Sequence, residues 1–331
     1  MRPRVAILLA LLALGAFLGV FFGGLLSAES EAAAPATPTT TPNVLEEPIA
    51  AAAATAEPPV NEAVAPLAYD EEATRSSFRP KLTAGSFVAI DADEGRVLIA
   101  HAERARRPIA SLTKMMTALI VIEDGELDRK IRVPKAATLV EPSREGLRAG
   151  RWYPRRLLLY SALLVSANDS AEALGYAAGD GSLRRFYRRM NERAAELGMT
   201  LTHYQSTSGL EDESNLSTAL DQAILARAAL ENRTFAKIVR TRRKLVDWPP
   251  PTYAKEWINH NKMLVTYEGT YGVKTGYTTR AGACLVVAVE RNGHHVIGVL
   301  LDSTSIWADM PRLIDAAFRR LAAREDEAGG P

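Results

Sequence analysis

The sequence predicts an α+β domain in which an antiparallel sheet of about five strands is flanked by helices. Apolar strand-like segments occur near both ends of the region that follows residue 84, and apolar helix-like segments lie between them. A hairpin from each end and one further strand would form a single sheet that the helices cover. The chain has 331 residues, 47% of them hydrophobic, which supplies enough apolar surface for a full core.

The strands are expected in two hairpins. Segments 86–91 and 96–100 are apolar and are joined by a short turn containing Asp and Gly. Segments 283–289 and 295–301 are joined by a tight turn at 291–293. A strand bearing Lys274 completes the predicted sheet.

Helices are expected in the centre of the domain and at its end. Apolar residues recur every three or four positions over 112–122, which is typical of a helix buried in the core. A loop-rich stretch is expected over 124–151. Further helices are predicted over 157–164, 171–178, 183–197, from Ser217 or Thr218 to about 230, and over 307–323.

The helix predicted over 183–197 carries four arginines on adjacent turns, namely Arg184, Arg185, Arg188 and Arg189. Such a run fits an anionic wall polymer or lipid, but a solvated helix face is the more common explanation. The sequence alone favours the solvated face.

The N-terminus combines basic residues with a long apolar run. Arg2 and Arg4 precede 22 uncharged residues at 5–26. A run of this length can cross a bilayer, yet small residues shortly after it also suit a signal peptidase. Residues 1–28 are therefore predicted to be a signal peptide or a membrane anchor. Both interpretations place the rest of the chain outside the cytoplasm, either membrane-anchored or secreted.

Residues 29–80 have the composition of a linker. They hold eight of the 18 prolines, nine acidic residues and two arginines, with almost no large apolar residue before Tyr69. Such a segment cannot bury enough surface to fold, so a disordered Ala/Pro/Thr/Glu-rich tether is predicted. The folded domain is expected at 81–325 and a short tail at 326–331. The mild positive charge of the domain does not indicate nucleic-acid binding.

A serine and a lysine three residues apart lie at the start of the buried helix. Ser111 and Lys114 share one helix face, so the amine is expected near the hydroxyl. Apolar neighbours disfavour the charged form of Lys114 and lower its pKa, which lets it act as a base at neutral pH. The helix N-terminus adds N–H groups where an oxyanion forms. These are the parts of an activated nucleophile, although Ser-x-x-Lys alone also occurs by chance.

Two further motifs follow in the chain. Ser166-Ala167-Asn168 stands at the end of an apolar helix, and Lys274-Thr275-Gly276 lies on a strand. Each alone has an ordinary structural explanation, as a helix cap or as a strand and turn. Ser-x-x-Lys, a Ser-x-Asn motif and Lys-Thr-Gly in this order form the signature of penicillin-binding proteins and class A β-lactamases. The sequence resembles this superfamily over about residues 84–323, and in particular its low-molecular-mass D-alanyl-D-alanine carboxypeptidases.

The resemblance implies a DD-peptidase/β-lactamase-like fold and a peptidase that acts in cell-wall biogenesis in the extracytoplasmic envelope. Its substrate would be a peptidoglycan stem peptide ending in D-Ala-D-Ala, and β-lactams would be covalent inhibitors. Ser111, Lys114 and Ser166 would be catalytic. The substrate would be bound by Asn168, Lys274, Thr275, Gly276 and Tyr277, with the backbone N–H groups of Ser111 and Tyr277 holding the oxyanion.

The sequence departs from the family at one binding position. Many relatives place an arginine shortly before the closing helix to bind the substrate carboxylate, but residues 303–307 contain none. Arg280 or Arg312 is expected to substitute for it.

Two other functions remain open from the sequence. A serine β-lactamase needs a deacylating glutamate, and the nearest match is Glu211, which instead follows Ser208-Gly209-Leu210 in the manner of the carboxypeptidases. A catalytically idle wall-binding module would have no need of a buried lysine. No cofactor or metal is expected, because none of the five histidines stands in a metal-ligand pattern. Cys284, the single cysteine, has no partner for an internal disulfide.

Overall fold

The computed structural model describes residues 67–69, 79–210, 215–248 and 253–328. The predicted N-terminal segment at 1–28 and most of the predicted linker at 29–80 lie outside these residues. No helix of the described ranges is long and apolar enough to span a bilayer. The apolar run at 5–26 is not among them.

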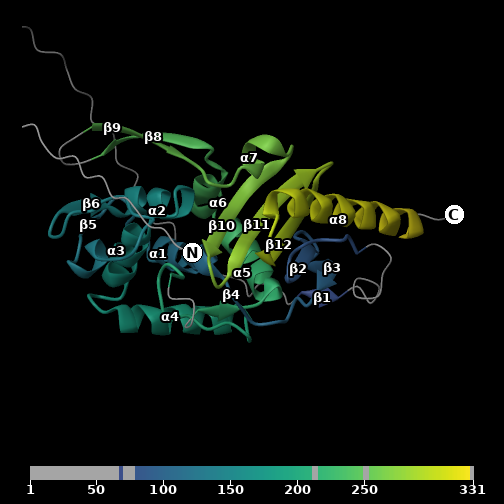
Figure 1. Cartoon of the computed structure of the whole chain (residues 1–331), viewed down its shortest axis with the longest axis horizontal. Helices are drawn as coiled ribbons and strands as arrows, with labels where there is room; N and C mark the ends of the chain where they lie inside the picture. Colours follow the sequence, from purple (N-terminus) through teal and green to yellow (C-terminus); the bar gives the residue numbers. More distant parts are fainter. Residues whose placement is uncertain (1–66, 70–78, 211–214, 249–252, 329–331) are drawn as a thin grey trace, which may run out of the picture. The chain divides into compact units, whose positions relative to one another are not determined.

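A six-stranded sheet forms the centre of the fold, in the order β1-β3-β2-β12-β11-β10 (Figure 1). All its neighbouring strands are antiparallel except β1 and β3. The predicted hairpins and the Lys274 strand supply five of the six strands. They are β2 (Ser86–Asp91), β3 (Arg96–His101), β10 (Thr270–Thr278), β11 (Gly282–Arg291) and β12 (His294–Ser303).

The sixth strand, β1 (Ala68–Tyr69), corrects the predicted linker, because these residues fall within 29–80. The Ala68 N–H donates to the Gly95 carbonyl at 2.8 Å, and the Tyr69 hydroxyl donates to Glu103 at 3.1 Å. Leu67 and Tyr69 also pack against the core. Two large side chains and an unpaired edge of β3 are enough to order this short piece locally, which the composition of the whole segment does not reveal.

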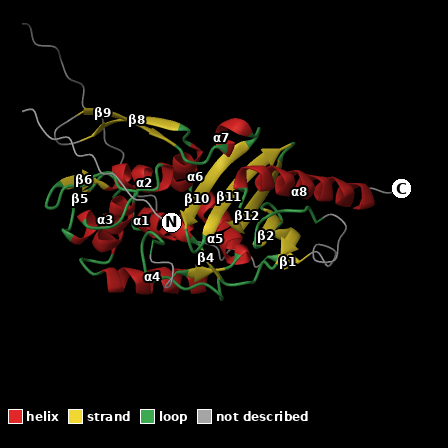
Figure 2. Cartoon of the chain, in the orientation of Figure 1, coloured by secondary structure: helices red, strands yellow, loops and turns green. Residues whose placement is uncertain are grey.

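Helices cover both faces of the sheet, and Figure 2 shows the strands in yellow with helices in red on either side of them. Helix α8 (Ile306–Ala328) packs on one face through buried residues that include Met310, Leu313 and Ile314. It begins one residue earlier than predicted and continues into the predicted tail at 326–331. The other face meets α5 (Ala219–Glu231) and α6 (Arg233–Arg240).

The remaining helices pack together beside the sheet as predicted from their apolar spacing. The buried helix at Ser111 divides into a 3₁₀ turn and an α-helix, and every residue of the latter from Thr113 to Ile122 is buried. The bounds are η1 (Ala110–Leu112), α1 (Thr113–Glu123), α2 (Arg155–Leu164), α3 (Asn168–Ala178) and α4 (Leu183–Glu196).

Several short elements were not predicted. A hairpin of β8 (Arg243–Trp248) and β9 (Tyr253–Ile258) pairs outside the main sheet, and α7 (Met263–Thr266) follows it. The stretch expected to be loop-rich over 124–151 contains β5 (Lys130–Arg132), which pairs with β6 (Trp152–Pro154), and the 3₁₀ turn η2 (Ala136–Thr138). The two-residue strands β4 (Arg107–Pro108) and β7 (Leu216–Ser217) pair with each other, and η1 begins just after β4. Apart from β8 and β9, which are as long as β2 and β3, these elements are too short for a periodic signal.

Candidate active site

Ser111 lies half-buried in η1, directly ahead of the buried helix α1. The preceding Ala110 has a φ of 46°, a left-handed conformation that is costly for a residue with a side chain. Gly209 packs against this turn so closely that a Cβ on it would lie 1.8 Å from the Ala110 carbonyl oxygen. The serine is therefore held on a tight, well-supported turn at the end of a rigid helix.

Lys114 points from the first turn of α1 toward Ser111. Its Nζ lies 2.7 Å from the Ser111 Oγ, 2.8 Å from the Asn168 Oδ1 and 3.0 Å from the Ser208 carbonyl oxygen. The side chain is fully buried, and this desolvation, with the nearby Lys274 charge, holds the pKa of Lys114 well below its usual value. The amine is thus in hydrogen-bond range of the hydroxyl, and burial favours its neutral form more than in an exposed lysine.

Ser166 and Asn168 come from the junction of α2 and α3. Ser166 has a φ of 62°, which is again in the left-handed region. A residue with a side chain keeps this costly conformation only where the surrounding contacts hold it in place. Asn168 is the first residue of α3, and its Nδ2 donates to the Glu141 carbonyl at 3.0 Å while its Oδ1 accepts from Lys114. The amide therefore joins the first turn of α1 to the loop that contains Glu141.

Lys274 lies on β10, which is the edge strand of the sheet next to η1. Its Nζ lies 3.0 Å from the Ser166 Oγ and 2.9 Å from the Thr275 carbonyl oxygen. Burial lowers the pKa of Lys274 to about 7. A second lysine of lowered pKa thus contacts the second serine, so that each serine of the site has its own lysine.

A cavity of about 580 Å³ opens over these groups. It brings together most of the predicted site residues, and the buried Lys114 and Lys274 lie beneath its lining. The residues that line it include Ser111, Ser166, Asn168, Thr275, Gly276 and Tyr277, together with Pro142, Ser143, His260, Ser305 and Trp307.

Neither of the two arginines predicted to bind a carboxylate lines this cavity. Arg280 and Arg312 are both exposed and absent from its described lining. His260 is instead the one titratable base on the described wall, and it was missed because a single histidine gives no motif. Desolvation and the charges of Lys274 and Lys114 lower the pKa of His260. Glu211, on which the β-lactamase alternative depends, lies outside the described residues.

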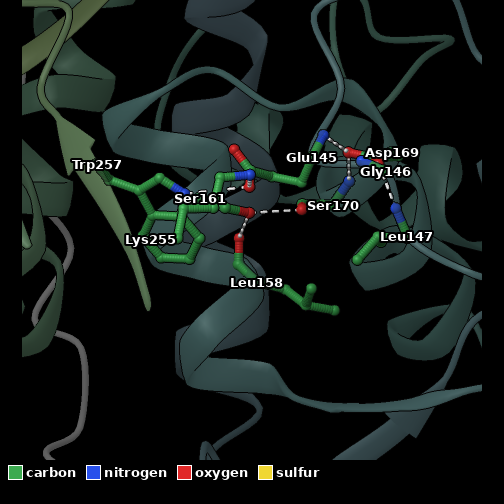
Figure 3. Close-up of polar contacts among 9 residues, drawn as sticks. All are labelled: Glu145, Gly146, Leu147, Leu158, Ser161, Asp169, Ser170, Lys255 and Trp257. Carbon is green, nitrogen blue, oxygen red and sulfur yellow. Dashed lines mark hydrogen bonds and ion pairs between the residues drawn. The ribbon is translucent and has the colours of Figure 1, made fainter. Parts of the chain in front are cut away.

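Asp169, next to Asn168, fastens the loop that forms one wall of the cavity (Figure 3). Its carboxylate accepts hydrogen bonds from the N–H groups of Glu145, Gly146 and Leu147 at 2.9 to 3.0 Å. The Asn168 N–H donates to the Ser143 carbonyl at 2.8 Å. Pro142 and Ser143, which line the cavity, are thereby tied to the start of α3.

Glu145 links the same loop to the β8–β9 hairpin, as Figure 3 shows. Its Oε2 pairs with the Lys255 ammonium and accepts from the Trp257 indole N–H at 3.1 Å. The carboxylate is only 6% exposed, so its charge depends on these two partners. Behind the loop, the Ser161 hydroxyl donates to the Ser170 hydroxyl at 2.5 Å and joins α2 to α3. The cavity wall is therefore anchored on both sides.

Together these groups can perform nucleophilic acyl transfer. A serine hydroxyl 2.7 Å from a buried amine has a proton acceptor in place, and a second serine–lysine pair stands across the same cavity. A sheet edge beside the nucleophile can align an extended peptide.

Comparison with known proteins agrees with this chemistry. The D-alanyl-D-alanine carboxypeptidase family model matches residues 72–305. The D-alanyl-D-alanine carboxypeptidase of Streptomyces sp. strain K15 is 35% identical over 72% of this chain and 89% of its own length. D-alanyl-D-alanine carboxypeptidase DacB2 of Mycobacterium tuberculosis is 34% identical over 72% of this chain and 84% of its own length.

A solved structure supports the same relationship and confirms the predicted fold class. The crystal structure of the Streptomyces K15 DD-transpeptidase superposes with a TM-score of 0.69 at 33% identity, covering 73% of this chain and 99% of that one. The family model spans well over half of the chain, and the fold and motifs agree with it. This chain therefore belongs to the D-alanyl-D-alanine carboxypeptidase family of serine peptidases.

Proposed function

We propose that this serine D-alanyl-D-alanine carboxypeptidase removes the terminal D-alanine from peptidoglycan stem peptides through an acyl-enzyme on Ser111. The observation that carries the proposal is the 2.7 Å separation of the Lys114 Nζ from the Ser111 Oγ. Lys114 is buried and its pKa is lowered, so its neutral amine can accept the hydroxyl proton at neutral pH.

In the first step, the Ser111 oxygen attacks the carbonyl between the two D-alanines while Lys114 takes its proton. The negative oxygen that forms is held by the backbone N–H groups of Ser111 and Tyr277. This role is supported by the close approach of β10 to η1, which brings the backbone next to Gly276 up to the nucleophile.

Ser166 passes a proton to the nitrogen of the leaving D-alanine as the tetrahedral intermediate collapses. Lys274 orients the Ser166 hydroxyl, from which its Nζ is 3.0 Å away, and supplies positive charge beside it. The departing amine takes the Ser166 proton, and Ser166 in turn takes the proton that Lys114 accepted from Ser111, so that Lys114 is neutral again for the hydrolytic step.

The substrate lies along the edge of β10 as an added strand. Thr275 and Lys274 receive its terminal carboxylate, and Asn168 binds its backbone while holding Lys114 in place. Water then hydrolyses the acyl-enzyme with Lys114 as the base. A β-lactam, whose ring amide mimics the dipeptide, acylates Ser111 in the same way and remains bound.

The apolar run at 5–26 places the enzyme in the cell envelope, either as an uncleaved anchor or as a removed signal peptide. The envelope location is supported by the family, whose reaction takes place on the cell wall. Mass measurement of the mature protein distinguishes the two forms, because cleavage near residue 28 removes the run.

The deciding experiment uses the full chain in detergent, as wild type and Ser111→Ala, with diacetyl-Lys-D-Ala-D-Ala. Release of D-alanine by the wild type alone supports the proposal. Absence of release, combined with rapid turnover of penicillin, would instead make the chain a β-lactamase. Absence of both release and penicillin labelling would support an idle wall-binding module.

A further inference from the structure

A hollow lined by basic side chains lies along α6, apart from the catalytic cavity. Two adjoining cavities of about 430 Å³ each share Arg233 and Lys237 on their walls, and we call them together the α6 groove. The first is lined by Arg156, Tyr160, Arg233, Thr234, Lys237, Ile238 and Lys244, and the second by Arg233, Ala236, Lys237, Arg240 and Thr241. None of these residues lines the catalytic cavity, and none of them is acidic.

The sequence of α6 creates this face. Arg233, Lys237 and Arg240 are four and three residues apart, so they lie on one side of the helix, about 6 and 4.5 Å apart along its axis. The opposite side is buried through Phe235, Ile238 and Val239. Helix α6 packs against α2, as Figure 1 shows, and Arg156 of α2 and Lys244 of β8 complete the lining.

Most of these charges have no carboxylate partner. Among the described residues, no acidic side chain lies within ion-pair distance of Arg233, Lys237, Arg240 or Lys244. Lys244 and Arg240 lie over the rings of Tyr160 and Tyr271, at 4.4 and 5.5 Å. Arg156 is the exception, because Asp128 binds it at 2.8 Å.

The arginine run on α4 provides the contrast. Of the four arginines that the sequence singled out there, Arg185 pairs with Asp180, Arg188 with Glu192 and Arg189 with Asp124. Three of the four arginines on that helix face are therefore ion-paired at an exposed surface, and Arg184 is also exposed, which agrees with the solvated face favoured from the sequence. The groove on α6 has a comparable number of cations, but the part of the chain that the structure describes gives it no such counter-charges except Asp128 at Arg156.

We propose that the α6 groove binds a linear polyanion of phosphodiester units, such as an anionic polymer threaded through the cell wall. Several unpaired cations in a row attract a chain of negative charges by releasing its counter-ions. A chain of negative charges can contact cations in both cavities of the groove, from Lys244 to Arg240, whereas one small anion can contact only the cations nearest to it. The cations line a hollow, which suits a chain better than a flat lipid surface.

This inference goes beyond the proposed function, because no catalytic residue belongs to the groove. Binding there would keep the enzyme on the wall while successive stem peptides reach the catalytic cavity. The polymer is thus a docking partner and not a substrate.

The test measures fluorescence anisotropy of a labelled poly(glycerol phosphate) chain titrated with the full-length protein in neutral detergent. Arg233→Glu with Lys237→Glu is compared with Arg184→Glu plus Arg188→Glu on α4, which makes the same change in net charge. We expect the α6 variant to weaken binding by at least about tenfold and the α4 variant by less than about twofold. The slope of log K against log salt should fall by about 1.5 in the α6 variant alone, since each phosphate contact contributes roughly 0.7 to 0.9.

Equal weakening by both variants would overturn the proposal, because it would mean attraction by net charge alone. It would also be overturned by equally tight binding of inorganic phosphate. Binding to phosphatidylglycerol vesicles that depends on Arg233 and Lys237, without polymer binding, would mark a membrane surface instead. If the reversed pair fails to fold, Arg233→Gln with Lys237→Gln replaces it, with a smaller expected loss in the same direction.

Release of D-alanine from the soluble tripeptide is measured on the same samples. It should be unchanged in both charge variants, which shows that the catalytic cavity is intact. Because anisotropy does not depend on turnover, failure of the proposed function and failure of the docking proposal give different results.

Discussion

Gly276 and Ser111 lie so close together that a Cβ on Gly276 would come within 3.0 Å of the Ser111 backbone nitrogen. The same Cβ would stand 3.1 Å from the Ile109 carbonyl oxygen. The glycine of the Lys-Thr-Gly motif is therefore required by the approach of β10 to the nucleophile turn. Gly276 has no left-handed φ, so the reason is space and not backbone conformation.

Gly276→Ala should push β10 away from η1 by a few tenths of an ångström and misplace the Tyr277 N–H. We expect the rate of Ser111 acylation by fluorescent penicillin to fall by at least about tenfold, since small displacements in such sites are costly. The melting temperature should change little, because the strand remains paired with β11. An unchanged acylation rate would show that Tyr277 does not hold the oxyanion.

Comparing Lys114→Met with Lys114→Arg distinguishes two roles of Lys114, as a base that accepts the Ser111 proton or as a fixed positive charge. Arginine keeps a cation near Ser111 but does not lose its proton at neutral pH, whereas methionine keeps the bulk and has no amine. If Lys114 is the base, both variants should lose at least about a thousandfold in penicillin acylation rate. An arginine variant that keeps a tenth of the activity would assign Lys114 an electrostatic role instead.

The pH profile of kcat/KM should report Lys274. The pKa of Lys274 is lowered to about 7, so its cation is present below that pH and is lost as the pH rises through it. We therefore expect kcat/KM for diacetyl-Lys-D-Ala-D-Ala to decline above about pH 7, because the terminal carboxylate of the substrate then loses the Lys274 cation that binds it. In Lys274→Arg the decline should move upward by more than about one pH unit, at a lower absolute rate. A decline at the same pH in both proteins would assign it to another group.

Asp169 should contribute to stability through the loop that it holds. Asp169→Ala leaves the N–H groups of Glu145, Gly146 and Leu147 without their acceptor, and each such loss costs about 1 to 3 kcal/mol. We expect the free energy of unfolding in urea to fall by about 3 kcal/mol or more. Asp169→Asn keeps one oxygen and should fall by less. An equal loss of unfolding free energy in both variants would mean that the effect comes from packing and not from the accepted hydrogen bonds.

The Glu145–Lys255 ion pair predicts that a second substitution restores part of the stability lost by the first. Lys255→Met leaves the buried Glu145 carboxylate without its cation and should destabilise the protein by about 1 to 3 kcal/mol. Adding Glu145→Gln removes the stranded charge while its amide oxygen still accepts from Trp257. The double variant should therefore unfold at higher urea concentration than Lys255→Met alone. Additive losses would mean that the two charges do not depend on each other.

The proximity of the motif residues within each pair was predictable because each motif is local in the sequence. Ser111 and Lys114 are three residues apart, in η1 and in the first turn of α1, and Ser166 and Asn168 lie at the start of α3, so sequence spacing brings each pair together. That the three motifs meet at one cavity was inferred from their order in the sequence. The sheet that carries Lys274 was also predicted, because its strands are long and apolar, and their bounds were within a few residues.

The surrounding walls were not predictable in the same way. Glu145 sits in a stretch with no periodicity, and its partners Lys255 and Trp257 are more than a hundred residues away in a hairpin that was not predicted. His260 reaches the cavity from the end of that hairpin as a single residue without a motif. Long-range polar contacts of this kind depend on tertiary packing that neither propensity nor spacing encodes.

The edge of β10 is open along only part of its length. Its first half is covered, because the Asn261 amide donates to the Gly272 carbonyl at 2.8 Å and a Cβ on Gly272 would lie 3.1 Å from the Val239 side chain of α6. At the opposite side of the sheet, the two-residue strand β1 forms the other edge and pairs with β3. A sheet edge that is open over only part of its length exposes a template too short for a full strand of another molecule, which guards the protein against edge-to-edge aggregation.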